Sequence, residues 1–304
     1  MTCRGSFFIV GPTASGKSEI GAEVAHACGG EVVSADAFQI YAGLDLLTAK
    51  PGQELLNRVP HHLIGSVPVS EVMNAERFRA AAVAAIANIH RRGKRAIIVG
   101  GSGMYVKALT HGLSKLPAGD AALREELEPL TTPELHAKLH ELDPAGAASV
   151  DAKNRRRLIR AVEICLTSGR PAAEQRNRSE PADQAHGVFV FRDREELYRR
   201  INERVEMMFA NGVVDEVCGL GATSDTAAQT LGLRQIRALI AGQISEAECI
   251  AEIQQATRRY AKRQLTWFSR QTNFEPLNLT EHGLSESIEL MTRKARLSFA
   301  PQDD

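Results

Sequence analysis

Cysteine is scarce in this chain, and the cysteines present are not arranged for metal binding. The 304 residues include five cysteines, and no two of them form a C-x-x-C pair. Zinc sites and disulfide frameworks usually show paired or regularly spaced cysteines, so the sequence argues against both. We therefore expect reduced thiols, as in proteins of the cytoplasm.

Long apolar runs are missing as well. Near the amino terminus, the run Phe7–Val10 ends at a glycine after four residues, which is too short for a signal peptide. No segment approaches the roughly 20 apolar residues that a membrane-spanning helix needs. We expect a soluble, cytoplasmic and monomeric protein without a membrane partner.

The chain carries no excess charge of either sign. Its 37 basic residues balance 37 acidic ones, so a contact with nucleic acid would have to come from local clusters. Two basic clusters are present: Lys153, Arg155, Arg156, Arg157 and Arg160, and then Arg258, Arg259, Lys262, Arg263 and Arg270 beside Tyr260, Trp267 and Phe268. Such runs are usually solvated helix faces, but two of them in a neutral chain also fit a polyanion. Both interpretations stay open on charge alone.

Short apolar runs alternate with helical patterns in the first hundred residues. Strand-like runs occur at Phe7–Val10, Glu31–Ser34 and Arg95–Val99, and the segment Ser18–Cys28 has the apolar spacing of a helix. Strands that alternate with helices form parallel sheets covered on both faces. The sequence therefore predicts an α/β fold.

The middle of the chain has a different pattern. From about residue 120 to 171 every periodic stretch is helical, with Thr132 as the expected cap of one helix. Asn154 is the expected cap of a second helix, which should end at Gly169. We expect a helical insertion domain over residues 117–186, between a first part of the core (1–116) and a second part (187–304).

The chain returns to the core with the strand-like run Val188–Phe191. A capping box from Ser245 to Glu248 then marks the start of the last long helix, which should reach Trp267.

The strongest chemical signal is a glycine-bounded loop between the first strand and the first helix. Its sequence is Gly11-Pro12-Thr13-Ala14-Ser15-Gly16-Lys17-Ser18, which fits G-x-x-x-x-G-K-[ST]. Backbone N–H groups of such a loop converge on phosphate oxygens, the lysine bridges terminal phosphates and the Ser18 hydroxyl can ligate Mg²⁺. The motif predicts a P-loop NTPase-like sheet, in which a diphosphate would fit as well as the end of a nucleotide.

Two further motifs follow expected strands. Asp36 comes after the second strand and can be a general base or a metal ligand, and Ser102 follows the third strand within Gly100–Gly103. Because the carboxyl ends of parallel strands meet at one edge of the sheet, both side chains should point into the same crevice as the loop. Arg200 and Arg204, one helical turn apart, could clamp a diphosphate or form a surface pair.

Taken in order, the motifs resemble those of the bacterial tRNA dimethylallyltransferases. The segments that carry the resemblance are the loop Gly11–Ser18, Ser34-Ala35-Asp36 with Gln39-Ile40-Tyr41, Thr48-Ala49-Lys50-Pro51, Gly100-Gly101-Ser102 with Met104-Tyr105, Arg157-Leu158-Ile159-Arg160-Ala161 and Ala261-Lys262-Arg263-Gln264-Leu265-Thr266-Trp267. The loop alone occurs in many unrelated proteins, whereas the ordered set is highly specific. The resemblance runs from residue 6 to about residue 275.

The resemblance implies a reaction. The N6 amine of adenosine 37, just 3′ of the tRNA anticodon, would attack C1 of dimethylallyl diphosphate and release pyrophosphate. Asp36 would be the general base, with Ser102 and Arg204 as further catalytic residues. The loop Gly11–Ser18 and Mg²⁺ would hold the diphosphate, with Ser18 as the metal ligand.

The same resemblance assigns residues to the anticodon stem-loop of tRNA. They are Asp36, Ala37, Phe38, Gln39, Ser102, Arg124, Arg156, Arg157, Leu158, Ile159 and Arg160. Where the family reads Asp-Ser-Arg-Gln, this chain has Ala37 and Phe38 in the middle, which removes a hydroxyl and a cation. Ser102 replaces the family's threonine and keeps the hydroxyl.

Three other functions use parts of the same sequence. A P-loop kinase of a small metabolite would share the loop, an isopentenyltransferase could act on free AMP, and a nucleotide-dependent RNA-binding switch would form no product. The basic carboxyl-terminal segment favours tRNA over the first two.

Overall fold

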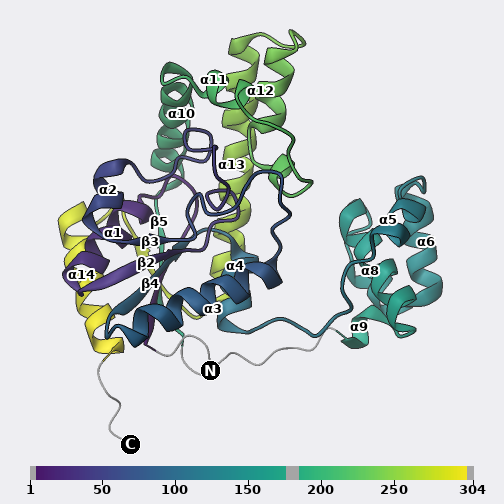
Figure 1. Ribbon diagram of the computed structural model, residues 1–304, viewed down its shortest axis with the longest axis horizontal. Coiled ribbons are helices and arrows are strands. Elements are labelled where there is room, and N and C mark those ends of the chain that lie inside the picture. The colour runs from purple at the N-terminus through teal and green to yellow at the C-terminus, as the bar shows by residue number, and fades with distance from the viewer. Residues whose placement is uncertain (1–4, 176–184, 300–304) are drawn as a thin grey trace, which may run out of the picture. The chain divides into compact units, whose positions relative to one another are not determined.

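The computed structural model of the protein describes residues 5–175 and 185–299. The chain divides into two compact units (Figure 1), one made of residues 1–110 and 181–304 and the other of residues 111–180. We call them the core unit and the helical unit. No helix in the described ranges is both long and apolar enough to cross a membrane.

The core unit is built on a parallel sheet of six strands in the order β3-β2-β4-β1-β5-β6. The strands are β1 (Ser6–Val10), β2 (Gly30–Ser34), β3 (His61–His62), β4 (Arg95–Gly100), β5 (His186–Phe191) and β6 (Glu275–Asn278). This arrangement confirms the predicted α/β fold. The edge strands β3 and β6 were not predicted, because two and four residues are too few to show a strand pattern.

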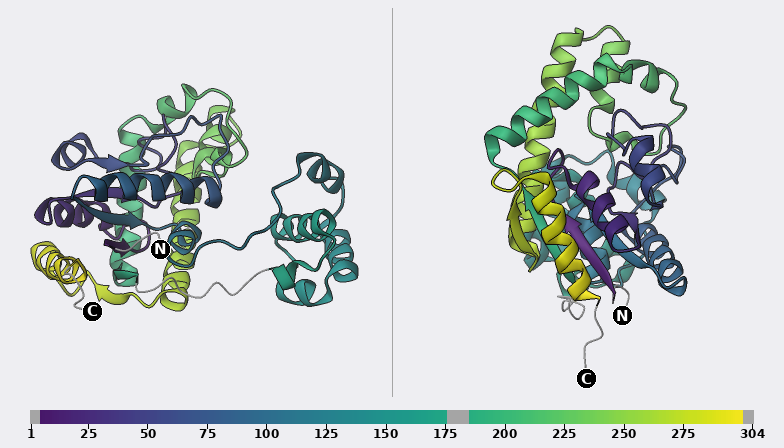
Figure 2. Two further views of the ribbon diagram at one scale, coloured as in Figure 1. Left: turned by 60° about the horizontal axis from the view of Figure 1, so that its bottom comes forward. Right: turned by 90° about the vertical axis from the view of Figure 1, so that its left-hand side faces the viewer.

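Helices cover both faces of the sheet (Figure 2), and the side chains of alternate β1 residues pack on each face. Phe7 and Ile9 pack in the core formed with α1 (Lys17–Ala27) and α14 (Leu284–Ser298). Phe8 and Val10 pack in the opposite core, formed with α3 (Ala75–Arg91), α4 (Gly103–Thr110) and α13 (Glu246–Gln271). Since both faces are buried, a one-residue slip of the strand would exchange its two sets of side chains and is strongly disfavoured.

Helix α13 is 26 residues long and begins at the predicted capping box, in which Ser245 and Glu248 exchange hydrogen bonds. Its buried residues follow a helical spacing: Cys249, Ile253, Thr257, Ala261, Gln264 and Phe268. The predicted end at Trp267 was too early, because Phe268 continues this buried stripe and no glycine or proline stops the helix.

Helix α10 (Arg194–Ala210) packs against α13 and buries Leu197, Ile201, Val205 and Met208 on one side. The remaining helices of the core unit are α2 (Gln53–Arg58), α11 (Val213–Cys218), α12 (Leu233–Ile240) and the short 3₁₀ helix η1 (Ala227–Gln229). Helix α10 is important for the site because two of its residues, Arg200 and Arg204, donate hydrogen bonds to the loop after β1.

The helical unit contains five helices in its described part. They are α5 (Ala121–Leu127), α6 (Thr132–Leu142), α7 (Pro144–Ser149), α8 (Arg155–Ser168) and α9 (Ala172–Gln175). The predicted ends of α8 are confirmed: the Asn154 side chain accepts a hydrogen bond from the Arg157 N–H, and Gly169 ends the helix at a φ of 66°.

The predicted cap of α6 was wrong by one residue. Thr131 rather than Thr132 is the cap, because a capping box needs an acidic residue three positions later and Glu134 meets that condition. The Thr131 N–H donates to the Glu134 carboxylate at 2.7 Å.

Candidate active site

The loop between β1 and α1 has a sharply bent backbone. Gly16 has a φ of 97° and Ala14 a φ of 64°, both in the left-handed region. A residue with a side chain rarely adopts this conformation, and residues that do are enriched at functional sites. The loop is tied to the sheet because the Gly11 N–H donates to the carbonyl of Gly100 at the end of β4, at 3.2 Å.

Three arginines each hold one residue of the loop. The bonds run from Arg192 Nε to Ser15 O (2.8 Å), from Arg200 Nε to Ala14 O (2.9 Å) and from Arg204 Nη2 to the Thr13 hydroxyl (2.8 Å). Arg192 follows β5, and the other two belong to α10. The sequence left open whether Arg200 and Arg204 bind a diphosphate or form a surface pair. In the structure both side chains contact the loop.

Gln264 of α13 joins the loop to the neighbouring strand end. Its Oε1 accepts from the Thr13 N–H at 2.9 Å, and its Nε2 donates to Gly101 O at 2.8 Å. A Cβ on Gly101 would lie 2.4 Å from Gln264 Nε2 and 2.8 Å from Gly11 O, so only glycine fits there. Sequence reasoning did not assign Gln264 a role, because one buried glutamine on a helix has no distinguishing pattern.

Lys17 and Arg204 bring buried positive charge to the loop. Burial lowers the pKa of Lys17 to about 8 and that of Arg204 to about 10, while the charge of Asp36 raises both. Lys17 Nζ donates to Pro12 O at 3.2 Å, and Arg204 Nε is buried without a hydrogen-bond partner among the described residues. The two positive charges of Lys17 and Arg204 exceed the single negative charge of Asp36, so this site favours the binding of an anion.

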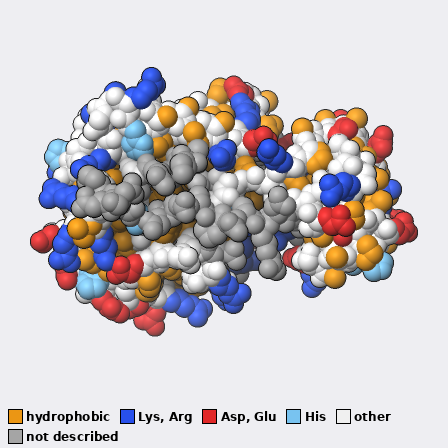
Figure 3. Space-filling model, turned by 90° about the horizontal axis from the view of Figure 1, so that it is seen from below, with side chains coloured by type: hydrophobic (Ala, Val, Ile, Leu, Met, Phe, Trp, Pro, Cys, Tyr) orange, Lys and Arg blue, Asp and Glu red, His pale blue; other side chains and the backbone are white. Residues whose placement is uncertain are grey.

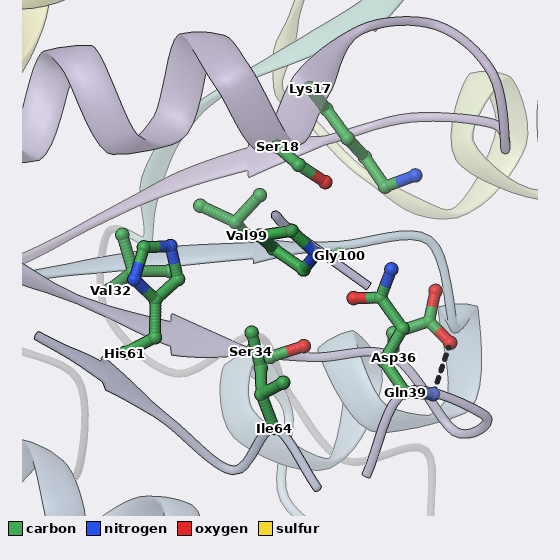
Figure 4. A pocket seen from close by; sticks show the side chains of 11 residues that line it. Lys17, Ser18, Val32, Ser34, Asp36, Gln39, His61, Ile64, Val99 and Gly100 are labelled. Carbon is green, nitrogen blue, oxygen red and sulfur yellow. Dashed lines mark hydrogen bonds between the residues drawn. The ribbon is translucent and has the colours of Figure 1, made fainter. Parts of the chain in front are cut away.

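Asp36 lies after β2, beside the loop (Figure 4). Its Oδ1 accepts from the backbone N–H groups of Phe38, at 2.9 Å, and Gln39, at 3.3 Å. These bonds fix the carboxyl group and leave Oδ2 without a partner among the described residues. Figure 4 also shows the Lys17 ammonium and the Ser18 hydroxyl on the other side of the same space.

Two cavities meet at Asp36. The first has about 280 Å³ of open space and is lined by Lys17, Ser18, Val32, Ser34, Asp36, Gln39, Pro51, His61, Ile64, Val99 and Gly100. The second has about 450 Å³ and is lined by Thr13, Asp36, Phe38, Leu47, Thr48, Arg204, Val205, Met208, Thr230, Leu231, Ile253, Thr257 and Tyr260. Both linings combine polar or charged groups with apolar side chains, which in the second cavity include Leu47, Val205, Met208, Leu231 and Ile253.

Ser102 contacts the segment that carries Asp36, but it is not among the residues that line the two cavities. Its hydroxyl accepts from the Ala37 N–H at 2.8 Å and is also hydrogen-bonded to Tyr260. Burial, with the charge of Asp36, raises the pKa of the Tyr260 hydroxyl, which therefore stays protonated. The Phe38 and Tyr260 rings lie 5.7 Å apart, so an aromatic pair borders the carboxylate.

In the helical unit, two of the residues assigned to tRNA bind a buried carboxylate. Arg124 and Arg160 contact Glu163 at 2.8 and 2.5 Å. Burial alone would raise the pKa of Glu163, but these two arginines and the Asp120 N–H lower it. Arg124 and Arg160 thus stabilise the fold of this unit, whatever else they contact.

The neighbouring positions of α8 differ in exposure. Arg156 and Arg157 are exposed, Ile159 is half-buried, and Leu158 is fully buried in the core of the helical unit. The Leu158 side chain therefore presents no surface to a partner, and the exposed arginines are the residues that do.

The second basic cluster lies on α13. Arg263 stacks over the Tyr260 ring at 5.6 Å, and Lys262 is exposed beside it. On the face of the core unit seen in Figure 3, basic and acidic side chains are interspersed, in keeping with the net charge of zero.

The oxygen atoms around the first cavity suit a magnesium ion. Within residues 5–175 and 185–299, no group of three or more His, Cys, Asp or Glu side chains is placed to hold a metal. Magnesium bound beside a phosphate needs only one or two protein oxygens, however. The Ser18 and Ser34 hydroxyls and the Asp36 carboxylate line this cavity and are donors of the right kind.

The parallel sheet, the bent loop after its first strand and the buried lysine that opens α1 define a P-loop-like α/β protein. Residues 39–271 match the family model described as IPP transferase. The tRNA dimethylallyltransferase of Akkermansia muciniphila is 44% identical over 266 residues, which cover 88% of this chain and 90% of that protein. The enzyme of the same name from Geobacter sulfurreducens is 46% identical over 275 residues, covering 86% and 88%.

A solved structure agrees with these relatives. The full-length tRNA isopentenylpyrophosphate transferase of Bacillus halodurans superimposes with a TM-score of 0.70 at 33% identity, covering 97% of this chain and 98% of that one. The chain therefore belongs to the IPP transferase family.

Proposed function

We propose that the protein transfers the dimethylallyl group of dimethylallyl diphosphate to the N6 amine of the adenosine that follows the tRNA anticodon, and releases pyrophosphate. Relatives named tRNA dimethylallyltransferase, matched over most of both chains, support this function. We further propose that the reaction takes place in the cytoplasm, in keeping with a tRNA substrate.

The observation that carries the proposal is the position of Asp36 in the linings of both cavities. A transferase of this kind must bring together a diphosphate, an allylic chain and an amine. Lys17 borders the first cavity and Arg204 the second, and the apolar side chains in the lining of the second cavity would contact the allylic chain. The carboxylate between them is thus within reach of the atom that gains positive charge.

On this proposal, the loop residues and the two cations bind the leaving diphosphate. Lys17, Arg204 and the Thr13 hydroxyl face it, and Arg192 and Arg200 keep the loop backbone in place. Ionisation of an allylic diphosphate separates charge, so cations fixed in advance around the leaving group supply the larger part of the stabilisation. Ser18, with the Ser34 hydroxyl nearby, would hold Mg²⁺, which when bound neutralises further negative charge on the diphosphate.

Asp36 then acts on the nucleophile. The N6 amine of adenine shares its lone pair with the ring and is a weak nucleophile, so a carboxylate that accepts its proton promotes the attack. The backbone bonds from Phe38 and Gln39 orient Oδ1, which leaves Oδ2 for the amine.

The target adenine must leave its stack in the anticodon loop to reach this carboxylate. We propose that Phe38 and Tyr260 receive the base, because aromatic faces stack on a base at a gain of about 1–3 kcal/mol. Phe38 stands where the family usually has an arginine, and it would bind the base by stacking where the arginine would contribute a charge. Exposed Arg156 and Arg157 of the helical unit and Lys262 of α13 would contact the phosphate backbone.

The experiment is product analysis with matched substrates. The protein is incubated with isotope-labelled dimethylallyl diphosphate and Mg²⁺, together with tRNA, with the same tRNA carrying guanine in place of the target adenine, or with free AMP. We expect the label in adenosine from the first RNA alone, as measured by mass spectrometry of nucleosides. Label on AMP would favour an AMP transferase, and conversion of added ATP to ADP would favour a kinase; either result would overturn the proposal.

A further inference from the structure

Glu216 of α11 makes an unusual set of contacts for a half-buried acidic residue. Its carboxylate accepts from three consecutive backbone N–H groups: Asp45 and Leu46 donate to Oε2, both at 2.7 Å, and Leu47 donates to Oε1 at 2.9 Å. These residues lie about 170 positions earlier in the chain, so the contact joins two distant segments of the core unit.

The three N–H groups begin a closed turn over residues 45–50. Within it the Ala49 N–H donates to Leu46 O and the Lys50 N–H to Asp45 O, each at 3.0 Å. The first N–H groups of such a turn point the same way and have no partner inside it, so they attract an anion. Glu216 provides this anion from within the protein and fixes the turn.

The turn 45–50 also supports the segment that carries Asp36. The Gln39 side chain donates to Ala49 O at 2.9 Å and to Thr48 O at 3.3 Å, and the Gln39 backbone N–H donates to Asp36 Oδ1. Ala49 has a φ of 48°, so its carbonyl is presented from a backbone conformation that needs support from its surroundings. A hydrogen-bonded chain therefore runs from Glu216 through the turn and Gln39 to Asp36.

The same turn shapes the second cavity, because Leu47 and Thr48 line it. Leu47 is buried in the core and packs close to Gly232, where an added Cβ would lie 2.9 Å from Leu47 Cδ1. Loss of the Glu216 contacts would thus release a wall of the cavity together with the support of Gln39.

We propose that Glu216 is a positioning residue for Asp36, acting through the turn 45–50. Glu216 lines neither cavity, so it acts through its neighbours and does not touch the substrate. The inference rests on the proposed function, because Asp36 is taken as the general base.

The test is a double-mutant cycle on the rate of the chemical step. Single-turnover rate constants for tRNA prenylation are measured with saturating dimethylallyl diphosphate for the wild type, Glu216→Gln, Asp36→Asn and the double variant. Glutamine has the size of glutamate but only one acceptor oxygen, so it cannot receive all three N–H groups. Glu203→Gln is the matched control, because Glu203 is an exposed residue of α10 that pairs with Arg199 on the same helix.

We expect Glu216→Gln to lower the rate constant by about 10- to 100-fold, the size of effect that a misplaced catalytic group produces. In the Asp36→Asn background the same change should have less than a threefold effect, because both residues act through one carboxylate. Glu203→Gln should leave the rate unchanged. A residue with only a structural role would lower the rate by the same factor in both backgrounds.

Either of two results would overturn the positioning role. They are a Glu216→Gln rate within twofold of the wild type, or an equal loss in the two backgrounds. If circular dichroism shows that Glu216→Gln does not fold, Glu216→Asp replaces it, since the shorter carboxylate keeps the charge, and the same two criteria apply. Wild-type protein that forms no prenylated tRNA would instead overturn the proposed function, and the inference with it.

Discussion

Replacement of Lys17 by methionine should stabilise the protein without ligand while it abolishes diphosphate binding. Lys17 is 9% exposed, and burial lowers its pKa from the usual 10.5 to about 8. That difference corresponds to about 3 kcal/mol of unfavourable free energy at pH 7, where the side chain is charged in both the folded and the unfolded chain. Methionine fills a similar volume without charge, so it removes this cost.

One contact is lost in the exchange. Lys17 Nζ donates to Pro12 O at 3.2 Å, and such a bond contributes about 1 kcal/mol. The net expectation is that Lys17→Met raises the free energy of unfolding by about 2 kcal/mol at pH 7. The direction of the pH dependence follows from the lowered pKa. Between pH 8 and 10.5 the unfolded wild type binds more protons than the folded one, so the free energy of unfolding of the wild type rises with pH. The difference in stability between the variant and the wild type therefore shrinks over this range.

Urea unfolding followed by tryptophan fluorescence measures both effects. Trp267 is the one tryptophan of the chain and packs against Gly103 in the core unit, so its signal reports the unit that contains the loop. Mg²⁺ and pyrophosphate at about 100 times the dissociation constant should stabilise the wild type by about 2.7 kcal/mol and the variant not at all. A variant less stable than the wild type at pH 7, or one that pyrophosphate still stabilises, would refute the reasoning.

Four further substitutions test three separate parts of the site. Asp36→Asn should lower turnover by about 10²–10⁴-fold with unchanged donor affinity, and recovery on added Mg²⁺ would show that the residue is a metal ligand instead. Arg156→Ala and Lys262→Ala should each reduce the salt dependence of tRNA binding by about one phosphate contact, whereas an unchanged slope would leave them as solvated side chains. Gly101→Ala should weaken pyrophosphate binding at least tenfold by displacing the glutamine that holds the loop, while Gly221→Ala, which meets nothing within 4 Å, should not; equal effects would contradict this account.

The sequence predicted the parts of the fold that depend on local patterns. The apolar runs of β1, β2, β4 and β5, and the capping box of α13, are local signals, and each was found where expected. Strand β6 was missed because it is four residues long and contains Pro276, which disfavours a strand assignment but is tolerated at the edge of a sheet. The cap of α6 was misplaced because two adjacent threonines precede the proline.

The site could be predicted as far as strand ends and one loop define it. Lys17 and Asp36 border one cavity because carboxyl ends of parallel strands lie at the same edge. Gln264 and Glu216 could not be predicted, because each contacts a segment more than 150 residues away and no spacing rule connects such partners. The contacts of Arg160 were likewise hidden, since a basic run does not show that Glu163 beneath it is buried.

The central claim, that the loop holds a diphosphate leaving group while a tRNA adenine is alkylated, is tested most directly by the stoichiometry of one reaction. Purified protein is supplied with tRNA, labelled dimethylallyl diphosphate, Mg²⁺ and ATP, and pyrophosphate, prenylated adenosine and ADP are measured in the same sample. We expect one pyrophosphate for each prenylated adenosine, with ATP unchanged. Consumption of ATP, or release of pyrophosphate without modified tRNA, would contradict the account.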